Sequence, residues 1–95
     1  MPQISFDFRC ASAPDESHKK VVEASTGDKL IDIIESLARK DEYVSNFIFD
    51  TSEMRLYPYH IIFAGDELLL PKDLDNYIIN EGSIYIRVLP FVSGG

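Results

Sequence analysis

The chain has 95 residues and a formal net charge of −7, with nine Lys and Arg against sixteen Asp and Glu. This length fits one domain, and its 45% hydrophobic and 12% aromatic residues are enough for a packed core. The cations are scattered, which argues against a nucleic-acid partner, because phosphate binding needs clustered positive charge. No apolar run approaches the roughly twenty residues of a membrane span, so we expect no membrane partner. The acidity either keeps the protein soluble or steers it toward a basic docking surface.

The start, Met1 to Ser5, lacks the basic and apolar stretches of a secretory signal. Cys10 is the single cysteine and cannot form an internal disulfide. Both features favour a reducing, cytoplasmic location. We interpret Cys10 as a small apolar strand residue, with a nucleophile as the alternative.

The first 24 residues predict two strands. From Gln3 to Cys10, apolar and polar residues alternate with the period of a half-buried strand. Ala11–Ser17 contains Pro14 and predicts a loop. His18–Ala24 predicts a second strand, with Val21 and Val22 at its centre.

An amphipathic helix is predicted next, with Asp28 as its N-cap. Its apolar residues recur at helical spacing and form one stripe that we assign to the core: Leu30, Ile33, Ile34, Leu37 and Ala38. Arg39 and Lys40 suit the negative pole at the helix end.

The segment Glu42–Tyr59 is irregular, and Met54–Tyr57 predicts a short hairpin arm. His60–Ala64 predicts a strand in which Ile61 and Phe63 point to one side, and His60, Ile62 and Ala64 to the other. Gly65-Asp66 turns the chain into Glu67–Leu70.

After this hairpin, Pro71–Asp73 predicts a loop and Leu74–Ile79 a helical turn. The final strand alternates so that Ile84, Ile86 and Val88 face the core, whereas Tyr85, Arg87 and Leu89 do not. Strands interrupted by one amphipathic helix predict an α+β structure in which the helix covers one face of a mixed sheet.

Two internal segments resemble ubiquitin. Ile61–Leu68 (IIFAGDEL) resembles its Leu-Ile-Phe-Ala-Gly stretch, and Leu74–Ile79 (LDNYII) resembles its Leu-Ser-Asp-Tyr-Asn-Ile. The tail Leu89–Gly95 (LPFVSGG) resembles the ending of molybdopterin synthase small subunits (MoaD-like) and of small archaeal modifier proteins (SAMPs). Phe47–Tyr59 also resembles the SAMP group.

The resemblance spans the chain and is sharpest from Phe47 onward. It implies a β-grasp, ubiquitin-like domain over residues 1–89 and a flexible Gly-Gly tail over residues 90–95, in an archaeal protein. Two departures are present. Phe91-Val92-Ser93 stand where ubiquitin has arginines, and Gly82-Ser83 replaces the Gly-Asp common in sulfur carriers.

The resemblance implies a protein modifier whose terminal Gly95 carboxylate is adenylated by a separate enzyme. The activated group is then joined to lysines by an isopeptide bond, converted to a thiocarboxylate for sulfur transfer, or both. The first alternative is the sulfur-carrier subunit of molybdopterin synthase. The second is a β-grasp interaction module that never reacts.

In each case no catalysis by the chain itself is expected, because no phosphate-binding loop, metal-ligand spacing or Ser-His-Asp set is present. No bound cofactor or metal is expected, and the partner uses the ATP. The expected partners of this monomer are a ubiquitin-activating-type (MoeB/ThiF-like) adenylating enzyme, then target lysines or sulfur-acceptor enzymes.

Two recognition surfaces follow. The first is the tail before Gly95, which the activating enzyme would recognise: Pro90, Phe91, Val92, Ser93 and Gly94. Phe91 and Val92 either anchor the tail in a partner's groove or pack on their own domain. The second is a patch on the outward side of the sheet, since an exposed apolar cluster often marks a partner site: His60, Ile62, Tyr85 and Leu89.

Overall fold

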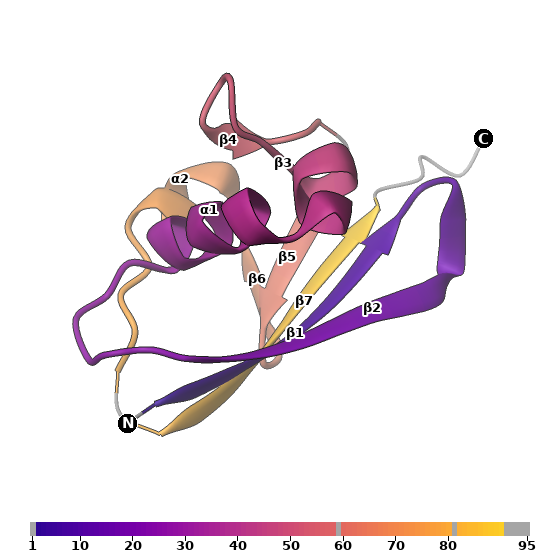
Figure 1. Ribbon diagram of the computed structural model, residues 1–95. Helices are drawn as coiled ribbons and strands as arrows, with labels where there is room; N and C mark the ends of the chain where they lie inside the picture. Colours follow the sequence, from indigo (N-terminus) through magenta and orange to yellow (C-terminus); the bar gives the residue numbers. More distant parts are fainter. Residues whose placement is uncertain (1, 59, 81, 91–95) are drawn as a thin grey trace.

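The computed structural model describes residues 2–58, 60–80 and 82–90. Its main element is a five-stranded sheet with the strand order β2-β1-β7-β5-β6 (Figure 1). These strands are β1 (Gln3–Cys10), β2 (Ala13–Glu23), β7 (Ser83–Pro90), β5 (His60–Ala64) and β6 (Glu67–Leu69). The two central strands, β1 and β7, are parallel, and every other neighbouring pair is antiparallel.

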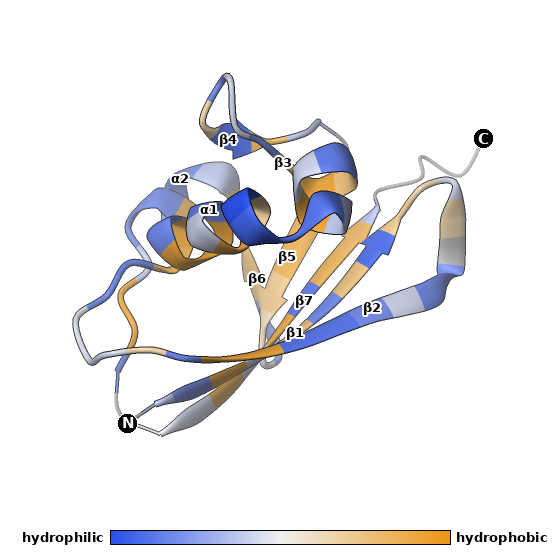
Figure 2. Cartoon of the chain, in the orientation of Figure 1, coloured by the Kyte–Doolittle hydropathy of each residue, from blue (hydrophilic) through white to orange (hydrophobic). Residues whose placement is uncertain are grey.

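Helices cover one face of the sheet, and no helix of the described residues covers the other, which we call the open side. The helices α1 (Leu30–Lys40) and α2 (Pro71–Asp75) and the π-helix η1 (Val44–Ile48) lie on the same side (Figure 1). Apolar residues of the strands and helices meet between these layers (Figure 2). The largest fully buried side chains include Phe6, Phe8, Phe49, Leu30, Ile34, Ile48 and Ile86. The predicted α+β architecture, with helices on one face of a mixed sheet, is confirmed.

The strand β2 is longer than predicted. It begins at Ala13, so the expected loop over residues 11–17 is mostly strand. The β1–β2 register is regular from Gln3↔Glu23 to Phe8↔His18 and then shifts, so that Cys10 pairs with Ala13. Pro14 is compatible with this arrangement because β2 is an edge strand, where a missing N–H does not interrupt a central ladder.

The helix α1 has the predicted stripe but not the predicted cap. Leu30, Ile33, Ile34 and Ala38 are buried, and Leu37 packs against the core at its edge. Lys29 occupies the N-cap position instead of Asp28. The Asp28 side chain accepts a hydrogen bond from the Ser25 amide (2.9 Å), so it stabilises the preceding turn rather than the helix.

The segment that we expected to be irregular contains a short helix and a hairpin over residues 44–56. Val44–Ile48 form η1, and a two-stranded sheet follows, with Phe49–Asp50 (β3) paired to Arg55–Leu56 (β4). The expected hairpin arm is therefore confirmed. Met54 in its turn has a φ of 58°, a left-handed conformation that is uncommon outside glycine.

The second short helix begins earlier than predicted. α2 spans Pro71–Asp75, where we expected a loop and then a turn from Leu74. Pro71 has the φ that the first helical position requires, and the Asp73 side chain accepts a hydrogen bond from the Leu70 amide (3.2 Å). Among the described residues, no helix is long and apolar enough to cross a bilayer.

Candidate functional site

The last described strand, β7, leads directly into the expected tail. Pro90, assigned to the tail, is the last residue of β7 and lies opposite His60 of β5. The predicted reactive and recognition residues Phe91, Val92, Ser93, Gly94 and Gly95 lie outside the described residues. The root of the tail is therefore paired to a strand that also packs against the core.

The predicted patch does not form one surface. Ile62 is only 1% exposed, because it lies opposite the buried Val88 and packs beneath the helices. The prediction that Ile62 lies on the outward side is therefore wrong. His60 shares this helix side by strand alternation, whereas Tyr85 and Leu89 lie on the open side.

His60 belongs to a different environment from Tyr85. Its Nδ1 donates a hydrogen bond to the Tyr57 carbonyl (2.9 Å). It lines a pocket of about 430 Å³ between β4 and α2, together with Leu56 and Leu74. The lining of this pocket includes the charged residues Arg55 and Asp75 beside apolar side chains, and it includes no residue of the open side of the sheet.

The open side carries a different apolar cluster, which we call the open-face cluster. It comprises the side chains that alternate with the core residues of β5, β6 and β7: Ile61, Phe63, Leu68, Tyr85 and Leu89. Leu68 is 47% exposed and Tyr85 is 44% exposed, and the other three are half-buried. Among the described residues no helix covers them, so this cluster is available to a partner.

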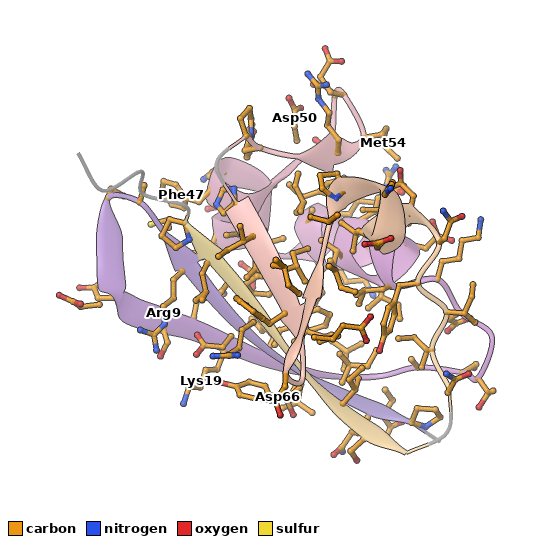
Figure 3. All side chains as sticks on the ribbon, turned by 180° about the vertical axis from the view of Figure 1, so that it is seen from behind. Arg9, Lys19, Phe47, Asp50, Met54 and Asp66 are labelled. Atoms are coloured by element: carbon orange, nitrogen blue, oxygen red, sulfur yellow. The ribbon has the colours of Figure 1, made fainter. Side chains whose placement is uncertain are left out.

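Cations lie on the open-face cluster and on its β1–β2 side. The Arg87 guanidinium lies over the Phe63 ring, 4.9 Å from its centroid, and its Nη2 donates a hydrogen bond to the Gly65 carbonyl (3.5 Å). Such a contact holds the charge against the apolar surface. Arg9 and Lys19 project from the neighbouring strands β1 and β2 (Figure 3).

The acidic residue among these cations is buried. Asp7 is 3% exposed, and its Oδ2 accepts hydrogen bonds from the Tyr85 hydroxyl (3.2 Å) and the Arg9 guanidinium (3.4 Å). Partial burial of the Tyr85 hydroxyl, followed by the adjacent Asp7 carboxylate, raises the pKa of Tyr85. The phenol therefore stays protonated and donates to Asp7 at neutral pH. A partner on this face would meet Arg9, Lys19 and Arg87 before it met this carboxylate.

Sequence reasoning missed the binding potential of Phe63, Leu68, Asp7 and Arg87. Each was visible as a strand residue. Arg87 was placed correctly on the side of β7 away from the core, but assigning Ile62 to the outward side put Phe63 on the wrong face. The missing information was the β5–β7 register, which sets Phe63 beside Arg87. The same register pairs Ile62 with the core residue Val88, which places Ile62 in the core as well.

Cys10 has the environment of a buried strand residue. It is 6% exposed, and its Sγ lies 3.2 Å from the Ser12 hydroxyl. This contact, together with Tyr43, lowers the pKa of the Cys10 thiol despite its partial burial. Within the described part of the chain, no group of three His, Cys, Asp or Glu side chains is placed to hold a metal ion.

The fold matches a known class. No protein-family description matches the sequence, and no curated protein matches it either. The solved structures do include a match: the chain has the ubiquitin-like β-grasp fold of the SAMP type. One similar structure is the crystal structure of SAMP1 from Haloferax volcanii, at a TM-score of 0.69 and 16% identity, covering 98% of this chain and 99% of that one.

Proposed function

We propose that the protein is a ubiquitin-like modifier and sulfur carrier, whose reactive group is the carboxylate of Gly95. The observation that carries this proposal is the connection from β7 to the Gly-Gly sequence within a SAMP-type fold. The strand β7 is held between β1 and β5 and ends at Pro90, five residues before Gly95. A rigid root followed by two glycines suits insertion into a narrow partner site, because glycine adds no side chain and tolerates most backbone angles.

The first step of the proposed reaction activates the carboxylate. A Gly95 carboxylate oxygen attacks the α-phosphorus of ATP, pyrophosphate leaves, and an acyl adenylate forms. The ATP site and catalytic groups belong to a separate adenylating enzyme.

Two nucleophiles can then attack the acyl carbon. A lysine amine forms the isopeptide bond, loses a proton and displaces AMP. A sulfide equivalent instead displaces AMP and leaves a thiocarboxylate. The same activated Gly95 therefore serves protein modification and sulfur transfer, and the nucleophile that attacks the acyl carbon decides between them.

The open-face cluster is the proposed docking surface for the adenylating enzyme. Its apolar side chains lie on β5, β6 and β7, the last of which leads to the tail. Because Arg87 lies on it and Arg9 and Lys19 lie on its β1–β2 side, we infer that the enzyme presents apolar residues flanked by acidic groups on that side. This local positive charge is opposite to the net charge of −7. Close contact at the cluster therefore favours an acidic partner surface, whereas long-range steering of the whole chain favours a basic one.

ATP–pyrophosphate exchange with a cognate adenylating enzyme tests the proposal. Deletion of Gly94-Gly95 should abolish exchange. Arg87→Glu should weaken the apparent affinity without removing exchange at saturation, because it alters docking and not the acyl group. Arg55→Glu is the matched control, because it makes the same charge change at an exposed residue of the β3–β4 hairpin, away from the open-face cluster. Exchange that persists after the deletion would refute the proposal. Equal losses for Arg87→Glu and Arg55→Glu would refute only the docking surface.

A further inference from the structure

The strand β2 has a free edge. It is the first strand in the sheet order and pairs only with β1 among the described strands. From His18 to Glu23 this pairing is regular, without a bulge. A regular edge strand presents unpaired N–H and C=O groups that another strand can use.

The hydrogen-bonding phase of this edge follows from one contact. The Ala24 amide donates to the Pro2 carbonyl (3.0 Å), which makes Pro2 and Ala24 a hydrogen-bonded pair that continues the β1–β2 register. Antiparallel pairs alternate between bonded and non-bonded, and the non-bonded residues direct their backbone groups outward. Lys19, Val21 and Glu23 are those residues, so all three point their N–H and C=O groups away from β1.

The side chains of these three residues lie on the open side of the sheet. Val21 is the centre of the set and is 62% exposed, the highest value among the large hydrophobic residues described. Lys19 and Glu23 flank it two residues away on either side and carry opposite charges. Opposite charges facing each other across two strands stabilise the pair, as do apolar side chains.

This arrangement is complementary to itself. We propose that β2 pairs antiparallel with β2 of a second copy of the chain, around a two-fold axis at Val21. Val21 then lies opposite Val21 of the other copy, and each Lys19 lies opposite Glu23 of the other copy. The outward backbone groups of all three residues are satisfied in both chains. The pairing forms a closed, isologous interface and one continuous ten-stranded sheet.

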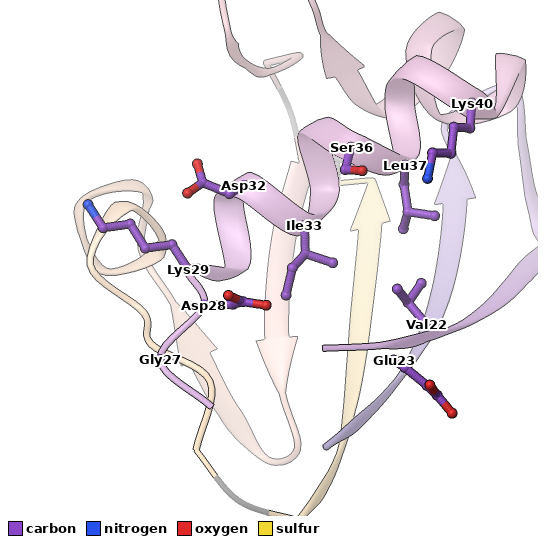
Figure 4. A pocket seen from close by; sticks show the side chains of 10 residues that line it. All are labelled: Val22, Glu23, Gly27, Asp28, Lys29, Asp32, Ile33, Ser36, Leu37 and Lys40. Carbon is purple, nitrogen blue, oxygen red and sulfur yellow. The ribbon is translucent and has the colours of Figure 1, made fainter. Parts of the chain in front are cut away.

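The helix side of the edge has room for the second strand. A groove of about 610 Å³ separates β2 from α1, and Val22, Ile33 and Leu37 face one another across it (Figure 4). In the proposed pairing Lys20 of one copy lies opposite Val22 of the other, so its aliphatic stem covers that apolar side chain. No described element of the chain occupies this space.

The interface is small, and the association is therefore weak and reversible. It uses about five residues of each chain, which bury much less surface area than the interface of a stable dimer does. The net charge of −7 on each copy also opposes association at low ionic strength. The dimer should therefore appear at high protein concentration and moderate salt, and the reaction at Gly95 does not require it.

Sedimentation equilibrium of the full chain at about 0.15 M ionic strength tests the pairing. The wild type should show a concentration-dependent monomer–dimer equilibrium. Lys19→Glu should weaken it by at least about tenfold, because two attractive pairs become two repulsive ones. Glu23→Lys should do the same, and the double variant Lys19→Glu/Glu23→Lys should restore association by exchanging the charges.

Lys72→Glu on α2 is the matched control, because it makes the same charge change away from β2. It should weaken association only by the general effect of the added negative charge, and Glu23→Lys should not restore the loss. A wild type that is monomeric at every concentration would overturn the proposal, and lysines on an edge strand would then act as a guard against pairing. Association that Lys19→Glu leaves unchanged, or that the double variant fails to restore, would overturn it equally.

Discussion

Ile62 and Phe63 are adjacent in sequence but lie on opposite faces of the sheet, which separates stability from docking. Ile62 is 1% exposed and belongs to the main core, whereas Phe63 is half-buried beneath the Arg87 guanidinium. Ile62→Ala removes three carbons, which at about 0.8 kcal/mol each costs about 2.4 kcal/mol. The cavity that remains should raise the loss in free energy of unfolding to about 3–4 kcal/mol.

Phe63→Ala should behave differently. Its side chain loses the contact with Arg87 and part of its burial, which we expect to cost about 1 kcal/mol of unfolding free energy. It should, however, weaken binding to the adenylating enzyme more than any effect on folding explains.

Urea unfolding followed by circular dichroism measures both variants. At about 4–8 °C per kcal/mol, Ile62→Ala should also lower Tm by at least about 12 °C. If that variant does not fold, Ile62→Val should cost about 0.5–1.5 kcal/mol. Our assignment of the two faces is refuted if Ile62→Ala costs less than Phe63→Ala, or if Ile62→Val is neutral and selectively weakens enzyme binding.

Three further predictions concern the folded domain. Partial burial would by itself raise the pKa of Asp41, but hydrogen bonds from His18 (2.8 Å) and Lys20 (3.3 Å) outweigh it and hold that pKa below its usual value. The stability that the Asp41 carboxylate contributes is therefore present above about pH 4 and is lost as the pH falls. Asp41→Asn should flatten this part of an acid-unfolding profile, and an unchanged profile would contradict the account. Burial, followed by the contact with Cys10, raises the pKa of Tyr43 to about 12. The free energy of unfolding should therefore fall as the pH rises from about 10 toward 12. Tyr43→Phe should reduce that loss and remove the highest-pH step of tyrosine ionisation in an ultraviolet titration. Met54→Gly should raise the free energy of unfolding by about 0.5–1 kcal/mol, because it relieves a left-handed φ of 58°; a destabilised variant in thermal unfolding would show that the turn is not strained.

Local patterns predicted the strands and the helix because their periods are written in neighbouring residues. The alternation of β1, β5 and β7 and the stripe of α1 depend only on residues a few positions apart. The extension of β2 to Ala13 was not predictable in this way, because it depends on pairing with Cys10 across a register shift.

The candidate surface was harder to predict because it depends on pairing between distant segments. Alternation separated Ile62 from Phe63 correctly, but only the β5–β7 register shows which of them faces the helices. The contact between Tyr85 and Asp7 joins residues 78 positions apart. Asp28 illustrates a local competition: its carboxylate had two nearby amide groups to bond, and it bonds that of Ser25 instead of capping α1.

The central claim is that Gly95 carries the reactive carboxylate, and mass spectrometry of the protein from its own cells tests it most directly. The digest needs a protease that cuts next to Ser93, since trypsin does not cut there. We predict chains that end at Gly95 with one carboxylate oxygen replaced by sulfur, Gly-Gly remnants on lysines of other proteins, or both. An unmodified carboxylate in every molecule with no remnant on any lysine, or a chain that continues beyond Gly95 in the cell, would contradict the account.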